Sequence, residues 1–315
     1  MVLGLASSHA PTMFVELEEW EELHQKLVKD VPQPLELQQE SLEFRASCKE
    51  RIQKAFSDLR NQLEAAKPDV LVIVGDDQNE LFGPSCQPSL AIFVGEEAKG
   101  SPLVHRTGRV AEGDELLIKC HSQFAIHLAN ELVKQEFDVS VVHELVPQGR
   151  LEKGLGHAFS RIAGIMELEQ LDIPAVLVFL NAYNPPLPTA KRCYDLGQAI
   201  AAITRQNSER VAIYGSGGLS HDPTGPRAGW IDEPLDRWVL EAIASGQAHR
   251  LKEMFIVDSD TMHGGTGEIR SWITTAGAFE GVAATVVDYI PLRHAVTGLG
   301  FASWNPSNTV GSRTE

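Results

Sequence analysis

Apolar runs of strand length alternate along the chain with longer segments of helical spacing. Strands are predicted, in chain order, at residues 1–6, 69–74, 90–95, 139–145, 173–181, 210–217 and 282–290. Helices are predicted at residues 14–30, 36–66, 113–136, 189–206, 232–254 and 267–279. Strands that alternate with helices indicate an α/β fold, and continuous apolar runs such as PDVLVIVG are typical of parallel strands covered on both faces.

We expect one domain over residues 1–315, with a mostly parallel central sheet flanked by helices. No repeat, low-complexity tract or long linker divides the 315 residues. Pro32 and Pro34 interrupt the helical pattern of residues 14–66, which predicts a helical hairpin inserted after the first strand. The polar C-terminal segment, about residues 303–315, is expected to be a loose tail.

Composition restricts the possible partners and the compartment. The formal net charge of −16 argues against nucleic acid or an anionic membrane, since both require a basic surface. The four cysteines form no C-x-x-C pair, so a structural zinc site or a redox motif is not expected, and a reducing compartment fits best. The N-terminal MVLGLASSHAP has no basic region and is interpreted as a first strand rather than a signal peptide. No run approaches the roughly 18 apolar residues of a membrane helix, so we predict a cytoplasmic protein.

Chemically active side chains follow several of the predicted strands. His9 ends the segment VLGLASSHAP, and His221 ends the glycine-rich segment GSGGLSH. Because the carboxyl ends of parallel strands meet at one edge of an α/β sheet, these side chains are expected to lie near one ligand crevice. Each histidine has a structural alternative, a hydrogen-bonded role without function, and His221 is the better candidate for a general acid or base.

Acidic groups occur at two of these junctions. The segment VGDDQNELF places Asp76, Asp77 and Glu80 directly after the most apolar strand, either as a solvated loop or as cation ligands. Glu268 begins a helix after three glycines, where the helix dipole alone favours a carboxylate by about 0.3–1 kcal/mol, and where a metal ligand is equally well placed.

Further candidates lie in loops. His157 in KGLGHAFS either contacts a substrate or simply begins a helix, and Asn181 and Tyr183 follow a buried strand in NAYNPPLP. No G-x-S-x-G elbow and no Walker A motif occurs, so a serine hydrolase or a kinase has no support.

Taken together, these segments resemble the class III extradiol ring-cleavage dioxygenases, in particular the catalytic β-subunits of the protocatechuate 4,5-dioxygenase type. The resemblance runs from LASSHAP to Phe279 and is most specific in NAYNPPLPTAKRCYDLGQAI, VAIYGSGGLSH and GGTGEIRSWITTAGAF. It implies one α/β domain with a mononuclear Fe(II) held by two histidines and a glutamate. His9 and Glu268 match two of these ligands, His221 matches the acid/base histidine, and His157 matches another substrate-facing histidine.

One position departs from this pattern. The resemblance places the second histidine ligand in a motif of the form N-D-H after VLVIVG, but the chain reads Asp76-Asp77-Gln78. Three outcomes are compatible with this departure. Gln78 binds iron in place of the histidine, with or without an adjacent Asp; the site holds a harder cation such as Mn²⁺ or Mg²⁺; or ring cleavage has been lost.

The leading hypothesis is an Fe(II)-dependent extradiol-type dioxygenase that cleaves a small catechol-like or aminophenol-like aromatic with O₂. Its metal ligands would be His9, Gln78 and Glu268, its catalytic residues His221 and His157, and its substrate-binding residues Asp77, Asn181 and Tyr183. The alternative is a diverged binding or regulatory protein, or different metal-dependent chemistry. The resemblance also implies a homo-oligomer. The insertion at about residues 14–66 has the size and the Leu, Glu and Gln content to cap the site or to form a dimer face.

Overall fold

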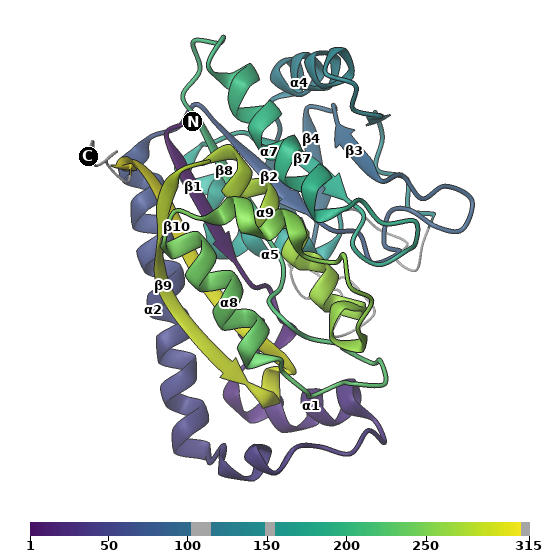
Figure 1. Cartoon of the computed structure of the whole chain (residues 1–315), viewed down its shortest axis with the longest axis vertical. Helices are drawn as coiled ribbons and strands as arrows, with labels where there is room; N and C mark the ends of the chain where they lie inside the picture. The colour runs from purple at the N-terminus through teal and green to yellow at the C-terminus, as the bar shows by residue number, and fades with distance from the viewer. Residues whose placement is uncertain (102–114, 149–154, 310–315) are drawn as a thin grey trace.

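The computed structural model describes residues 1–101, 115–148 and 155–309, and it contains one large and one small sheet (Figure 1). The large sheet has eight strands in the order β6-β3-β7-β2-β8-β1-β10-β9. In chain order these are β1 (Leu3–Ser7), β2 (Val70–Gly75), β3 (Leu90–Phe93), β6 (Ser140–Val142), β7 (Ala175–Leu180), β8 (Val211–Ser216), β9 (Val282–Leu292) and β10 (Thr297–Thr309). The small sheet pairs β4 (Glu97–Gly100) with β5 (Leu116–Lys119).

The four central strands determine where the ligand crevice can form. The strands β7, β2, β8 and β1 are neighbours and run parallel, so their carboxyl ends lie at the same edge. Antiparallel strands follow outside this group, with β10 on β1, β9 on β10, and β3 on β7, while β6 runs parallel to β3. The predicted α/β class with a mostly parallel central sheet is confirmed.

Helices cover both faces of the large sheet (Figure 1). Successive residues of β2 alternate between the two sides, since Val72 packs into one core cluster and Leu71 into the other. The first cluster contains side chains of α4 (Ser122–Lys134), α7 (Ala190–Thr204), α8 (Glu233–Ala244) and α9 (Ile269–Ala278). The second contains side chains of α1 (Trp20–Val28), α2 (Leu42–Ala66), α5 (His157–Ile165) and α6 (Leu168–Leu171).

Short 3₁₀ helices connect these elements. They are η1 (Pro11–Phe14), η2 (Leu17–Glu19), η3 (Leu35–Gln39), η4 (Ala248–Glu253), η5 (Asp260–Met262), η6 (Gly264–Glu268) and η7 (Arg293–Ala295). Within the described ranges, none of the helices combines the length and the apolar character needed to cross a bilayer.

Two of the differences between the predicted and the observed elements arise from strand pairing. Residues 113–136 were expected to be one helix, but Leu116–Lys119 form β5 and the helix α4 begins only at Ser122. The reason is pairing with β4, which buries Ile118 against its partner strand. Residues 303–309 extend β10 along β9 rather than belonging to a loose tail, because Ser303 and Trp304 pair with β9 and are buried. Residues 310–315 lie outside the described part.

A close helix contact gives a first prediction. A Cβ at Gly197 of α7 would lie 1.9 Å from the carbonyl oxygen of Thr274 in α9. Alanine is the better helix former by about 1 kcal/mol, but the clash is with backbone, which cannot rotate away. We therefore expect Gly197→Ala to destabilise the protein by about 1–3 kcal/mol, as overpacked cores do. Urea unfolding measures this, and a variant as stable as the parent would contradict the close contact.

Candidate active site

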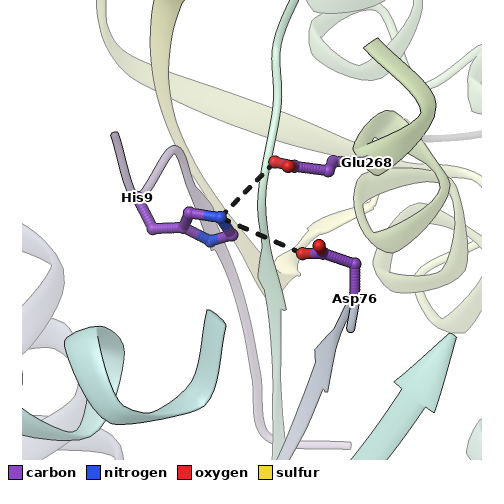
Figure 2. Close-up of side chains that lie close together, drawn as sticks. All are labelled: His9, Asp76 and Glu268. Atoms are coloured by element: carbon purple, nitrogen blue, oxygen red, sulfur yellow. Dashed lines mark ion pairs between the residues drawn. The ribbon is translucent and has the colours of Figure 1, made fainter. Parts of the chain in front are cut away.

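Three ionisable side chains meet at the carboxyl edge of the central strands (Figure 2). His9 follows β1, Asp76 is the first residue after β2, and Glu268 ends η6 just before α9. The Nε2 of His9 lies 3.5 Å from Oε2 of Glu268 and 3.9 Å from Oδ1 of Asp76. One candidate ligand atom from each residue lies within 4.8 Å of the others. Three groups at this spacing could bind one metal ion.

The hydrogen bonds of His9 fix its tautomer. Ser216, the last residue of β8, donates its hydroxyl hydrogen to the carbonyl oxygen of Ala158 at 2.6 Å. The Nδ1 of His9, 2.9 Å from the same hydroxyl oxygen, must therefore donate to it. Burial lowers the pKa of His9 well below its usual value, so the ring is neutral. The lone pair of Nε2 then points toward the two carboxylates, as a metal ligand requires.

Asp76 is the most unusual group in the site. Its side chain is 2% exposed, and neither carboxyl oxygen has a hydrogen-bond partner among the described residues. Burial, with the carboxylates of Glu268 and Glu80 close by, raises the pKa of Asp76 well above its usual value. Buried polar atoms are rarely left without partners. A divalent cation between Asp76, Glu268 and His9 would satisfy these atoms, so the residues present fit such an ion.

Glu268 uses its two oxygens differently. Oε1 accepts hydrogen bonds from the Tyr183 hydroxyl and the Gln78 amide. Oε2 accepts one from the backbone N–H of Gly218 at 2.8 Å and faces His9. Burial alone would raise the pKa of Glu268, but His221 and His9 outweigh it and hold the pKa below its usual range. Glu268 is therefore a charged ligand candidate.

His221 lies beside Glu268 without belonging to the group of three. Its Nδ1 lies 2.8 Å from the carbonyl oxygen of Leu219 and so carries the hydrogen. Its Nε2 is 3.3 Å from Oε1 of Glu268. Burial alone lowers the pKa of His221, but the Glu268 carboxylate outweighs it and raises the pKa. Gly265 leaves room for the ring, since a Cβ there would lie 2.1 Å from Nε2. Proton exchange at this histidine is thus confined to Nε2.

His157 is held by Glu80. The carboxylate of Glu80 accepts the backbone N–H of His157 at 3.0 Å and lies 2.6 Å from its Nδ1. With Nδ1 held by Glu80, Nε2 is the ring nitrogen left to face the site, and Gln78 lies 3.4 Å from it. His157 begins α5 and also faces the site, so the two alternatives from the sequence are compatible.

A cavity of about 120 Å³ opens over these groups. His9, His157, His221 and Glu268 form its polar part, together with Gln78. The rest of the wall is mostly apolar or small, and includes Ala10, Pro11, Leu27, Pro223, Thr224 and Val296.

The insertion contributes to this wall. Leu27 comes from α1, and its carbonyl oxygen accepts the backbone N–H of Thr224 at 3.0 Å. Arg161 of α5 also lines the cavity, and it donates to the carbonyl oxygen of His9 at 2.9 Å. Burial lowers the pKa of this guanidinium to about 10. Through Leu27, the helical insertion of residues 14–66 helps to enclose the site within the same chain.

The three predicted substrate-binding residues have different places. Asp77 is turned to its own loop, where its carboxylate accepts the N–H groups of Leu81 and Phe82. Asn181 stabilises the turn after β7, since it bonds the backbone of Tyr183 and Asn184. Tyr183 alone reaches the site, through Glu268. Asp77 and Asn181 are thus engaged with loop backbone rather than with the cavity.

The sequence-based ligand set had omitted Asp76, Glu80 and Ser216. Asp76 and Glu80 had been considered, with Asp77, as a solvated loop or as cation ligands, and Ser216 had not been singled out. The signal available was position, because Asp76 is the first polar residue after a fully apolar strand.

The model of the catalytic LigB subunit of aromatic ring-opening dioxygenases matches residues 5–300. The chain belongs to this family. The LigB match covers every residue of the site just described, from His9 to Glu268. A crystal structure of the uncharacterized protein JW3007 from Escherichia coli K12 has the same fold, with a TM-score of 0.54 at 14% identity, over 96% of this chain and 99% of that one.

Two curated relatives with similar sequences are named as dioxygenases. A 2,3-dihydroxyphenylpropionate/2,3-dihydroxicinnamic acid 1,2-dioxygenase of Comamonas testosteroni is 27% identical over 64% of this chain. A gallate dioxygenase of Pseudomonas putida is 30% identical over 50% of this chain. The chain spans about half the length of these relatives, 58% and 45% respectively.

Proposed function

We propose that this LigB-family protein is a metal-dependent extradiol-type dioxygenase that cleaves the ring of a small catechol-like or aminophenol-like aromatic with O₂. The observation that carries the proposal is the group of His9, Asp76 and Glu268 beside a cavity that His9 and Glu268 line. In the described part of the chain, Nε2 of His9 and both carboxyl oxygens of Asp76 have no hydrogen-bond partner. Family membership and the dioxygenase names of the relatives support it.

His9, Asp76 and Glu268 would hold the metal. A divalent metal held there would supply a Lewis acid to which two adjacent hydroxyl or amino groups of the ring could bind, together with the chemistry that activates O₂. Fe(II) is the ion implied by the family resemblance. One imidazole with two carboxylates is a harder donor set than two imidazoles with one, so Mn(II) is the second candidate.

The protein groups around this position have separate tasks. His221 presents only Nε2 to the cavity, so it would take a proton from a substrate hydroxyl there and return it later. His157 would accept a hydrogen bond from the substrate at Nε2, since Glu80 holds its other nitrogen. Leu27, Pro223 and Val296 would pack on the ring and exclude water.

Cavity size limits the substrate. An apolar cavity of about 150 Å³ is known to bind benzene, so a space of about 120 Å³ suits one ring with small substituents.

The cytoplasmic location and the homo-oligomeric state stay predictions of the sequence.

The test is direct. The protein is reconstituted anaerobically with Fe(II) or with Mn(II), and O₂ uptake is followed with single-ring catechols, gallate-like triols and 2-aminophenols. We expect uptake with at least one single-ring diol or aminophenol and the appearance of a ring-opened product. A fully loaded protein that is silent on the whole panel would refute the proposed activity.

A further inference from the structure

The amide of Gln78 lies against one oxygen of Glu268. Its Nε2 donates to Oε1 at 3.0 Å and lies 3.0 Å from the hydroxyl of Tyr183, which donates to the same oxygen. These two hydrogen bonds come from different residues, and Nε2 of His221 also lies 3.3 Å from Oε1. A carboxylate oxygen offers about two lone-pair sites. Oε1 is therefore fully used by protein hydrogen bonds.

The other oxygen of Glu268 is in a different position. Oε2 accepts one hydrogen bond, from the N–H of Gly218, and faces Nε2 of His9 at 3.5 Å. One lone pair remains there for a metal. Asp76 lies on the same side, with its Oδ1 3.9 Å from Nε2 of His9 and with both of its oxygens lacking partners in the described part of the chain.

We propose that Gln78 is a positioning residue and not a metal ligand: its amide N–H holds Oε1 of Glu268, so that Glu268 binds the metal through Oε2 alone, and Asp76 supplies the third ligand. The ligand position thus moves from residue 78 to residue 76, the first residue after β2. The inference rests on the proposed function only in placing a divalent metal at this site. It replaces the ligand set His9, Gln78 and Glu268 expected from the sequence.

The two roles of Gln78 predict opposite results for one isosteric change. If Gln78 were a ligand through its amide oxygen, Gln78→Glu would replace a weak neutral ligand by a carboxylate and tighten metal binding. If it positions Glu268 through its N–H, the same change removes the donor and sets two carboxylates against each other. We therefore expect Gln78→Glu to weaken Mn²⁺ binding about 10- to 100-fold, the usual effect of losing a group that orients a ligand.

The experiment measures the affinity for Mn²⁺ alone at pH 8 by titration calorimetry, with no substrate present. Gln87→Glu is the matched control, because Gln87 lies in the same loop and donates to Asn79 instead of Glu268; we expect no change there. Asp76→Asn should lose more affinity than Gln78→Glu. Unchanged or tighter binding by Gln78→Glu, or unchanged binding by Asp76→Asn, would overturn the proposal.

Gln78→Leu is the second test variant, to be used if Gln78→Glu does not fold. Without the amide donor, only the Tyr183 hydroxyl still bonds Oε1. One lone pair of Oε1 then becomes available to the metal, so the visible absorption spectrum of bound Co²⁺ should change with a moderate loss of affinity. A spectrum and an affinity equal to those of the parent would remove the positioning role. Neither measurement uses turnover. A protein that binds Mn²⁺ as expected but cleaves no ring would leave this inference standing and refute the proposed dioxygenase activity.

Discussion

Glu268→Gln is expected to abolish ring cleavage and to lower the affinity for a divalent metal by more than about 100-fold, because loss of a ligand should exceed the 10- to 100-fold effect of losing a group that orients one. The substitution keeps the shape and removes the charge. It also creates a conflict inside the site. Oε1 accepts from Tyr183 and Gln78, and Oε2 accepts from Gly218, so an amide nitrogen on either side faces a donor.

That conflict adds a measurable effect on folding. A buried donor left without an acceptor costs about 1–3 kcal/mol, and the metal-free variant should lose stability in that range. Glu280→Gln is the matched control, since Glu280 is exposed, lies outside the site and accepts a hydrogen bond from Gln198. Calorimetric titration with Mn²⁺ and urea unfolding measure the two effects. If Glu268→Gln bound Mn²⁺ as tightly as the parent, the metal site would have to lie elsewhere.

The sheet and the location of the site could be predicted from the sequence because they depend on local signals. The runs at β2, β7 and β8 are apolar on both faces, which only a covered parallel strand explains. Residues that follow such strands meet at one edge, and His9 and His221 were selected for that reason. Glu268 was found through the family resemblance and its place at a helix start.

Other parts depend on partners that are distant in sequence. The segment of β5 has no local strand signal that distinguishes it from the helix that follows, and only its pairing with β4 decides its conformation. The C-terminal part of β10 is a strand because β9 pairs with Ser303 and Trp304 and, after an irregularity, with Thr309. Local periodicity contains no information about either partner.

Whether Asp76 or Gln78 is the metal ligand also depends on residues that are distant in sequence. The two residues are two positions apart, and the family resemblance pointed to 78. What separates them is the surroundings. Tyr183 and Glu268 engage the amide of Gln78, while no described side chain or backbone N–H bonds the carboxyl of Asp76. These neighbours come from more than 100 residues further along the chain, so spacing within one loop could not reveal them.

His221→Gln is expected to lower kcat for ring cleavage by about 10²- to 10⁴-fold, the usual contribution of a positioned general acid or base. Glutamine keeps a polar group in the cavity but cannot exchange a proton near neutral pH. Because His221 contacts Glu268 without belonging to the group of three ligand candidates, Mn²⁺ affinity should change far less than in Glu268→Gln. His249→Gln, at an exposed histidine outside the cavity, is the control and should behave like the parent.

Comparison of kcat, KM and Mn²⁺ affinity separates the possible roles of His221. A loss in kcat alone means that the histidine moves a proton. A rise in KM with kcat preserved would mean that it only binds the substrate, and it would contradict the assignment. A collapse of Mn²⁺ affinity would mean that His221 is itself a ligand. The structure argues against that last result, because Nε2 of His221 faces Oε1 of Glu268, while Oε2 of the same carboxylate faces His9. A metal bound through Oε2 would thus lie on the opposite side of the carboxylate from the proton-transferring nitrogen, and this separation would leave the base available to the substrate.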